Sequence, residues 1–109
     1  MIFSQGDIVK VNLNPIKGHE QGNYRPVLVI SSVPMPGNVN LIVPITSKTK
    51  TYPLEVMLDS RTATRGCILC FQMRTVDLQA RNAQFIEHLP DDLLDECLDY
   101  CKRILEPIC

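Results

Sequence analysis

Residues 7–31 read DIVKVNLNPIKGHEQGNYRPVLVIS, and this stretch decides the fold. It opens with apolar and polar side chains in alternation, a pattern typical of a half-buried strand with one face formed by Val9, Val11 and Leu13. It closes with a continuous apolar run over residues 26–31, rich in β-branched side chains, which predicts a central strand. The polar connection between them is longer than the roughly two to five residues that a plain hairpin needs.

The rest of the chain continues this pattern of short strands and polar loops. Further apolar runs predict strands at residues 39–45, 54–58, 67–72, 74–78 and 83–87. Residues 90–105 predict one helix, with Pro90 suited to its first position and an apolar face formed by Leu93, Leu94, Cys97, Leu98, Cys101, Ile104 and Leu105. We therefore expect a mainly β fold with a C-terminal helix, either a small β-barrel or a strongly bent sheet closed by that helix.

Composition limits the class of protein. A length of 109 residues fits one domain over residues 1–109, and a hydrophobic content of 45% can supply its core. No run of about 18 or more apolar residues occurs, which argues against a membrane-spanning helix. The first ten residues lack the basic and apolar regions of a secretory signal. We expect a cytoplasmic protein.

The chain has five cysteines, at positions 67, 70, 97, 101 and 109. Their odd number does not suggest a disulfide framework. Cys67 and Cys70 lie in a predicted strand, where residues three apart face opposite sides, so they are poorly placed to share a metal ion. Cys97 and Cys101 could share a ligand across one helical turn, but they fit an apolar helix face as well. We expect these residues to act as small buried hydrophobes, with neither a metal site nor a cofactor.

The charges are unevenly distributed along the chain. Residues 1–90 carry nine basic and six acidic side chains, a net charge of +3, whereas residues 91–109 carry two basic and six acidic ones, a net charge of −4. Most of the acidic side chains of the C-terminal segment fall on the polar face of the predicted helix. The remaining body is mildly basic, which is compatible with a positive groove for an anionic partner.

Three polar clusters lie at the ends of predicted strands and are candidates for a functional site. The first contains His19, Glu20, Gln21 and Arg25, the second Thr46, Ser47 and Lys48, and the third Gln72, Arg74, Thr75 and Asp77. Together they would form a cleft with cations, hydroxyls and an imidazole, but without the carboxylate cluster that a divalent metal prefers. Such a set can support metal-free phosphate chemistry, since an arginine neutralises phosphate charge and a histidine moves a proton.

Each of these residues also has an ordinary structural interpretation. Arg25 can be an exposed cation, which is the default for arginine. His19 can bond to the backbone within a turn, and Thr46 can make a local backbone hydrogen bond. Arg74 and Asp77 can form a structural ion pair. On residue chemistry alone, the chain is a curled sheet with a polar cleft.

The order of the motifs resembles the PemK/MazF family of bacterial type II toxins. The matching segments are GDIVKVNLNP (6–15), KGHEQGNYRPVLVI (17–30), PITS (44–47) and QMRTVD (72–77), followed by the amphipathic helix. The resemblance implies an SH3-like small barrel of the PemK/MazF (CcdB-like) fold that forms a homodimer. It also implies a metal-independent, sequence-specific mRNA interferase that cleaves single-stranded RNA by 2′-hydroxyl attack, leaving 2′,3′-cyclic phosphate and 5′-hydroxyl ends, and that a cognate antitoxin neutralises.

The same resemblance assigns roles to individual residues. Arg25 would stabilise the phosphate in the transition state, and Thr46 would contact the same group. His19 is the candidate proton-transfer residue. The candidates for RNA binding are Glu20, Gln21, Ser47, Lys48, Gln72 and Arg74.

This chain departs from the family pattern at Leu69 and Phe71. Some members carry charged residues with acid–base roles at these positions. Either His19 takes over the proton transfer, or positioning and charge stabilisation by Arg25 and Thr46 suffice, or the protein binds without cutting. Phe71 could instead stack on an RNA base or belong to the core.

Two functions without catalysis stay open at this point. A gyrase-poisoning toxin uses the same fold, but it acts through a C-terminal tryptophan and this chain contains no tryptophan. A family member that binds RNA or an antitoxin without cleavage would be consistent with Leu69 and Phe71.

Overall fold

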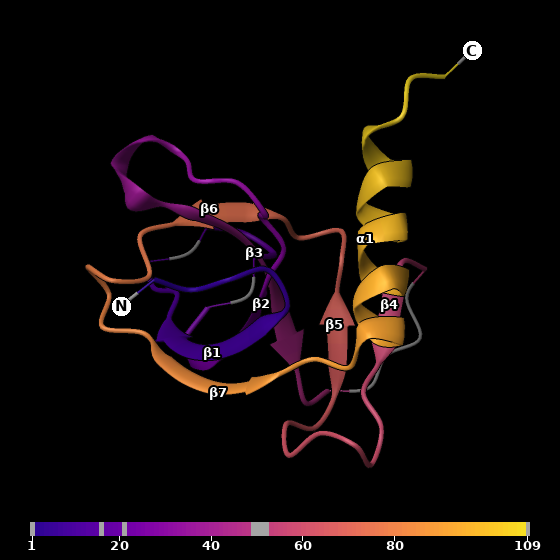
Figure 1. Ribbon diagram of the computed structural model, residues 1–109, viewed down its shortest axis with the longest axis horizontal. Coiled ribbons are helices and arrows are strands. Elements are labelled where there is room, and N and C mark those ends of the chain that lie inside the picture. The colour runs from indigo at the N-terminus through magenta and orange to yellow at the C-terminus, as the bar shows by residue number, and fades with distance from the viewer. Residues whose placement is uncertain (1, 16, 21, 49–52, 109) are drawn as a thin grey trace.

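The computed structural model describes residues 2–15, 17–20, 22–48 and 53–108. Within these residues it contains seven strands and one α-helix (Figure 1). They are β1 (Asp7–Asn12), β2 (Tyr24–Val29), β3 (Asn40–Thr46), β4 (Glu55–Met57), β5 (Cys67–Leu69), β6 (Arg74–Val76), β7 (Gln84–His88) and α1 (Asp91–Leu105), with a short 3-10 helix at Pro36–Asn38. The predicted mainly β fold with a C-terminal helix is confirmed, and every predicted strand has an observed counterpart.

All strand pairs are antiparallel, and β3 pairs with three other strands, β2, β5 and β6. The strand order is β4-β5-β3-β2-β1-β7, with β6 also paired to β3. The first half of β3 pairs with β6 over Asn40–Ile42, and its last two residues pair with β5. The sheet curls strongly, and α1 stands beside β5 and β4 (Figure 1). No pairing joins the outer strands β4 and β7 in the described residues, so the sheet is curled without closing through hydrogen bonds.

Apolar side chains pack on both faces of the central strands. The face away from α1 buries a cluster that includes Val9, Val11, Leu13, Val27, Val29 and Ile42. The other face packs against α1 through Ile8, Leu28, Val43, Ile45, Ile68, Leu93, Leu94 and Cys97. The predicted alternation of β1 is thus confirmed, and the continuous apolar run of β2 is explained because the strand is buried on both faces.

The helix and two of the strands differ from the prediction in detail. Pro90 is the N-cap residue of α1, so the helix begins one position later than expected. Ile104 and Leu105 were expected on the buried face, but they are 38% and 71% exposed. The last turn of α1 extends beyond the sheet, so these side chains have no strand to pack against (Figure 1). The predicted strand at 67–72 ends at Leu69 because the chain turns at Cys70 and Phe71 before β6 begins.

Four cysteines are buried free thiols, as the sequence predicted, and Cys109 lies outside the described residues. Burial, together with interaction with Glu55, raises the pKa of Cys67 to about 11. The Cys101 thiol donates a hydrogen bond to the Cys70 carbonyl oxygen at 3.7 Å. The described part of the chain contains no group of three or more His, Cys, Asp or Glu side chains placed to hold a metal ion.

A membrane-spanning helix is not found in the described part of the chain. α1 is its longest helix, and no helix there is long and apolar enough to cross a membrane.

Candidate active site

Arg25 and Thr46 lie at the same end of two neighbouring strands. Val27 of β2 pairs with Pro44 of β3, and continuing this antiparallel register by two residues sets Arg25 opposite Thr46. The Arg25 guanidinium donates one hydrogen bond from Nη1 to the Ile45 carbonyl oxygen at 3.3 Å and another from Nε to the Gly22 carbonyl oxygen. The two carbonyls fix the position of the cation while part of the guanidinium stays available to a ligand.

The electrostatics of Arg25 suit anion binding. The residue is partly buried, and this desolvation lowers the pKa of Arg25 from 12.5. Arginine nevertheless keeps its proton near neutral pH. A charge held in partly desolvated surroundings interacts with a phosphate more strongly than a fully hydrated one does.

Thr46 ends β3 and is only 6% exposed. Its Oγ1 accepts a hydrogen bond from the Lys48 backbone N–H at 3.2 Å. This is the local backbone bond considered from the sequence. The hydroxyl proton of Thr46 finds no acceptor among the described residues, so it can be donated to a ligand.

Gly66 fixes the distance between the start of β5 and the end of β3. It has a φ of +117°, and an added Cβ would lie 2.0 Å from the Thr46 carbonyl oxygen. The next residue, Cys67, pairs with Thr46 in the sheet. Only a residue without a side chain can occupy this point, and its close approach determines where Thr46 sits.

A pocket of about 460 Å³ opens beside Arg25. Of the predicted site residues, Arg25 and Ser47 line it. The sequence pattern did not single out three further lining residues, Lys10, Tyr24 and Arg65. Lys10 had one usable signal, since it is the outward-facing residue in the alternation of β1. Arg65 lies in a loop, and in a loop the sequence pattern does not indicate in which direction a side chain points.

Four further predicted residues gather around a second pocket of about 380 Å³, whereas Thr46 and Lys48 are among the described lining residues of neither pocket. The second pocket is lined by His19, Glu20, Gln72 and Arg74, together with Pro44, Phe71 and Met73. The consecutive β3 residues Pro44 and Ile45 line the second and the first pocket respectively, so the end of β3 lies between them. The structure therefore places six of the predicted residues in two adjoining pockets rather than one, and leaves the buried Thr46 at the end of β3 between them.

Hydrogen bonds shape the second pocket. Gln72 donates from Nε2 to the His19 carbonyl oxygen at 3.5 Å, and Arg74 donates from Nη1 to the Leu13 carbonyl oxygen at 3.2 Å. Glu20 accepts a bond from the Lys17 backbone N–H at 2.7 Å, which holds the loop in a turn. The bonds from Gln72 and Arg74 attach the segment around β6 to the chain between β1 and β2.

The remaining residues that the sequence analysis singled out lie in different surroundings. The Arg74–Asp77 ion pair does not form, because Asp77 instead accepts a bond from the Ala80 backbone N–H at 2.9 Å. Lys48 is exposed, and Gln21 lies outside the described residues. Leu69 is buried at 1% exposure, whereas Phe71 is 38% exposed and lines the second pocket.

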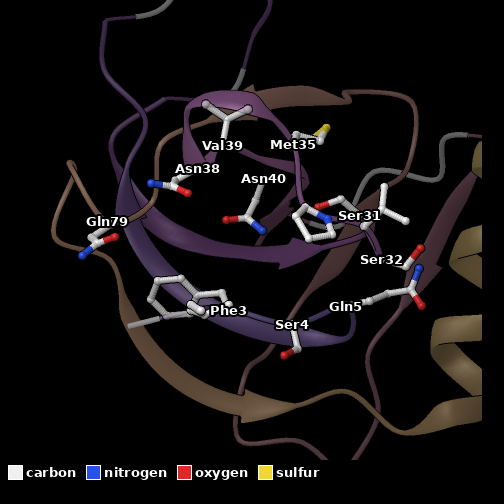
Figure 2. A pocket seen from close by; sticks show the side chains of 13 residues that line it. Phe3, Ser4, Gln5, Ser31, Ser32, Met35, Asn38, Val39, Asn40 and Gln79 are labelled. Atoms are coloured by element: carbon white, nitrogen blue, oxygen red, sulfur yellow. The ribbon is translucent and has the colours of Figure 1, made fainter.

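A third pocket, of about 540 Å³, lies at the opposite end of β2 and β3. Its lining includes Phe3, Gln5, Ser31, Asn38, Asn40 and Gln79 (Figure 2). None of its described lining residues is charged, and none belongs to the predicted site. It offers no group that would neutralise a phosphate.

Comparison with known proteins shows to which family the chain belongs. Residues 4–105 match the family of PemK-like, MazF-like toxins of type II toxin–antitoxin systems. The chain belongs to the PemK/MazF toxin family. It is 35% identical to the endoribonuclease PemK of Escherichia coli, over 94% of this chain and 82% of that protein. It is 34% identical to the endoribonuclease EndoA of Bacillus subtilis, over 88% of each.

Solved structures of PemK/MazF toxins share the fold over nearly the whole chain. MazF from Deinococcus radiodurans is 33% identical and superposes with a TM-score of 0.88, covering 96% of this chain and 97% of that one. A MazE–MazF complex from the same organism superposes with a TM-score of 0.83 at 32% identity. The SH3-like, CcdB-like fold that the resemblance implied is thus the fold of this toxin.

The contact between Gly66 and Thr46 generates a prediction on stability. We expect Gly66→Ala to lower the free energy of unfolding more than Gly37→Ala, as measured by urea denaturation. Both glycines have positive φ, so both variants carry a backbone penalty of about 1–3 kcal/mol. Only the Gly66 methyl group would meet backbone, whereas nothing lies within 4 Å of the position at Gly37. Equal losses in the two variants would contradict the close approach of β5 to β3.

Proposed function

We propose that this PemK/MazF toxin is a sequence-specific, metal-independent endoribonuclease that cleaves single-stranded mRNA and that a cognate antitoxin neutralises it. The observation that carries the proposal is that Arg25 and Thr46 lie at the same end of β2 and β3, with the cation held by two backbone carbonyls and the Thr46 hydroxyl proton without an acceptor among the described residues. The relatives named endoribonucleases, PemK and EndoA among them, support the same activity. The proposed functional unit is the whole chain, residues 1–109, acting in the cytoplasm.

The proposed reaction needs no external reactant. The 2′-hydroxyl oxygen of RNA attacks the adjacent phosphorus, and the bond from phosphorus to the 5′-oxygen breaks. The 2′-hydroxyl loses a proton and the departing 5′-oxygen gains one, which gives a 2′,3′-cyclic phosphate and a 5′-hydroxyl. Arg25 neutralises the charge that grows on the phosphate oxygens, and Thr46 donates its hydroxyl proton to one of them.

RNA binding is assigned to the residues around the two pockets. Ser47 and Lys48 follow Thr46 directly and would contact the backbone on one side of the cut. Gln72, Arg74 and Glu20 line the second pocket, where a neighbouring nucleotide can lie. Gln21 belongs to the same proposed set by its place in the family motif.

We also propose that the toxin is a homodimer. Phe85 and Ile86 on the outer strand β7 are 50% and 37% exposed, and Met57 on the outer strand β4 is 64% exposed. Exposed apolar side chains on the outer strands of a sheet favour association. Sedimentation analysis tests this, since a dimer has twice the chain mass of 12.3 kDa.

The proposal of an antitoxin partner is supported by the solved MazE–MazF complexes of related toxins.

Incubation of the purified protein with a long RNA tests the proposed reaction. We expect cuts at a recurring short sequence, with 2′,3′-cyclic phosphate and 5′-hydroxyl ends, at an unchanged rate in EDTA. Arg25→Ala and Thr46→Val should each lower the rate by about 100-fold or more, since each removes a preorganised contact to the phosphate. Arg25→Lys keeps the positive charge but lacks the planar guanidinium. A cleavage rate close to that of the wild type would assign the role of Arg25 to its charge, and a rate as low as that of Arg25→Ala would assign it to the geometry of its hydrogen bonds.

Several outcomes would contradict this mechanism. Inhibition by EDTA or 5′-phosphate ends would show a metal-dependent reaction. Full activity of Arg25→Ala, with its folded state verified by circular dichroism, would remove Arg25 from the site. A wild-type protein that binds RNA without cutting it would establish the non-catalytic function that Leu69 and Phe71 left open.

His19 is the proposed proton carrier. Leu69 and Phe71 cannot titrate, and the other histidine, His88, contacts Asp7 at 3.2 Å near the start of α1. The His19 loop is tied to Arg25 by the bond to Gly22. We expect His19→Gln to lower kcat by about 100-fold or more and to remove a limb of the pH–rate profile between about pH 5 and 8. His88→Gln is the matched control, and an unchanged profile in His19→Gln would exclude this role.

A further inference from the structure

The pocket beside Arg25 holds more positive charge than the proposed reaction uses. Lys10 of β1 and Arg65 of the loop before β5 line it together with Arg25. No carboxylate is among its described lining residues. Three cations around one pocket repel one another unless an anion lies between them, so the composition of the pocket points to a ligand with several negative charges.

Arg65 differs from every other arginine of the protein. Arg25, Arg74 and Arg81 donate hydrogen bonds to backbone carbonyls, and Arg61 and Arg103 pair with carboxylates. Arg65 is exposed and makes neither a hydrogen bond nor an ion pair with the described residues. No described residue accepts a bond from its guanidinium, so its donors are available to a ligand.

The loop that carries Arg65 is nevertheless held firmly. The Glu87 carboxylate on β7 accepts bonds from the Ala63 N–H at 3.1 Å, the Thr64 N–H at 2.8 Å and the Thr64 hydroxyl at 2.7 Å. Although burial opposes it, these bonds leave the pKa of Glu87 below its ordinary value of 4.5. Glu87 therefore stays charged at neutral pH, yet it bonds to the residues before Arg65 rather than to the guanidinium.

The other side of Arg65 is fixed by the sheet. Gly66 lies directly against the Thr46 backbone, so the Arg65 backbone is one residue away from the end of β3. At the far end of the loop, Arg61 bonds to Asp59 and to Asp92 of α1. The fold thus anchors a cation without a partner among the described residues next to the proposed reaction centre, and such a cation can position a polyanionic substrate there.

We propose that Arg65 binds the RNA backbone phosphate adjacent to the scissile one, with Lys10 adding charge to the same path; this inference rests on the proposed function. The planar guanidinium can bond to two oxygens of one phosphate. RNA carries one phosphate per nucleotide, so the phosphate next to the one at Arg25 would meet a second cation at Arg65. Tyr24 orients Lys10, whose Nζ lies 5.0 Å from the centre of the ring. Arg65 is a positioning residue, because it holds the strand without touching the reacting bond.

Salt-dependent binding tests the contact. The probe is a pool of 2′-O-methyl RNA oligonucleotides of random sequence, which cannot be cut because the attacking hydroxyl is blocked. Fluorescence anisotropy gives the affinity over a range of salt concentrations. We expect Arg65→Ala to weaken binding and to reduce the slope of log affinity against log salt by about 0.7, the value for one phosphate contact on a single strand. Arg65→Lys should restore the slope, and Arg103→Ala on α1 should change neither quantity.

Cleavage kinetics give a second readout. Because Arg65 holds a flanking phosphate, Arg65→Ala should raise KM for a cleavable RNA more than it lowers kcat, whereas Arg25→Ala should act on kcat. Loss of Arg65 removes no contact within the described chain, so the variant should fold and melt like the wild type.

The outcomes separate this inference from the proposed function. An unchanged salt slope in Arg65→Ala, with a wild type that cuts RNA, would overturn the Arg65 contact alone. A slope that depends on Arg65 in a protein that cuts no RNA would overturn the endoribonuclease and keep the contact. Absence of RNA binding by the wild type would overturn both. If Arg65→Ala impaired binding of the cognate antitoxin but not of RNA, the Arg65 contact to RNA would be overturned in favour of a contact to the protein partner.

Discussion

The pairing of β3 with three other strands is the constraint on which the rest of the structure depends. β3 pairs with β2 through its middle residues Ile42–Pro44, with β6 through its first three residues and with β5 through its last two. This sharing bends the sheet, because β5 and β6 leave the same edge of β3 in succession. It also brings three chain segments to one end of the sheet: the start of β2 with Arg25, the end of β3 with Thr46, and the loop before β5 with Arg65.

The chemistry of the site follows from the hydrogen bonds that the charged side chains at this end of the sheet make to backbone groups. Arg25 is held by backbone carbonyls, which fix the cation without neutralising it. Glu87 performs the corresponding task for the Arg65 loop, since it binds backbone N–H groups and leaves the guanidinium unpaired. The protein as a whole carries a net charge of −1. The positive charge of the pocket beside Arg25 is therefore a local property, and it persists because the nearby Glu87 carboxylate bonds to Ala63 and Thr64 rather than to a cation.

Much of the fold was readable from the sequence because it rests on local patterns. The alternation of β1 and the apolar run of β2 reported their burial directly, and the helical spacing of Leu93, Leu94 and Cys97 identified the face of α1 that meets the sheet. Ile104 and Leu105 continue that spacing beyond the reach of the sheet. Periodicity reports which face a residue occupies, but not whether a neighbouring element covers it.

The candidate site was less predictable, because its geometry is set by contacts distant in sequence. The family motifs indicated Arg25 and Thr46, and the register of β2 and β3 brings the two residues to the same end. Nothing local marks Gly66 as the residue pressed against Thr46, or Arg65 as an unpaired cation. Both properties depend on how a loop of eight residues, 59–66, is attached to β7 and α1. The separation of His19 from Arg25 into adjoining pockets likewise depends on the path of β3.

The account rests on Arg25 and Thr46 forming the binding site for the scissile phosphate. The most direct measurement is a crystal structure of the toxin with an RNA that carries a single 2′-deoxy substitution at the cleavage position. The account predicts that the phosphate next to this substitution lies within hydrogen-bond distance of the Arg25 guanidinium and the Thr46 hydroxyl, and that the neighbouring phosphate contacts Arg65. RNA bound with that phosphate elsewhere, such as in the uncharged pocket at the opposite end of the sheet (Figure 2), would contradict it.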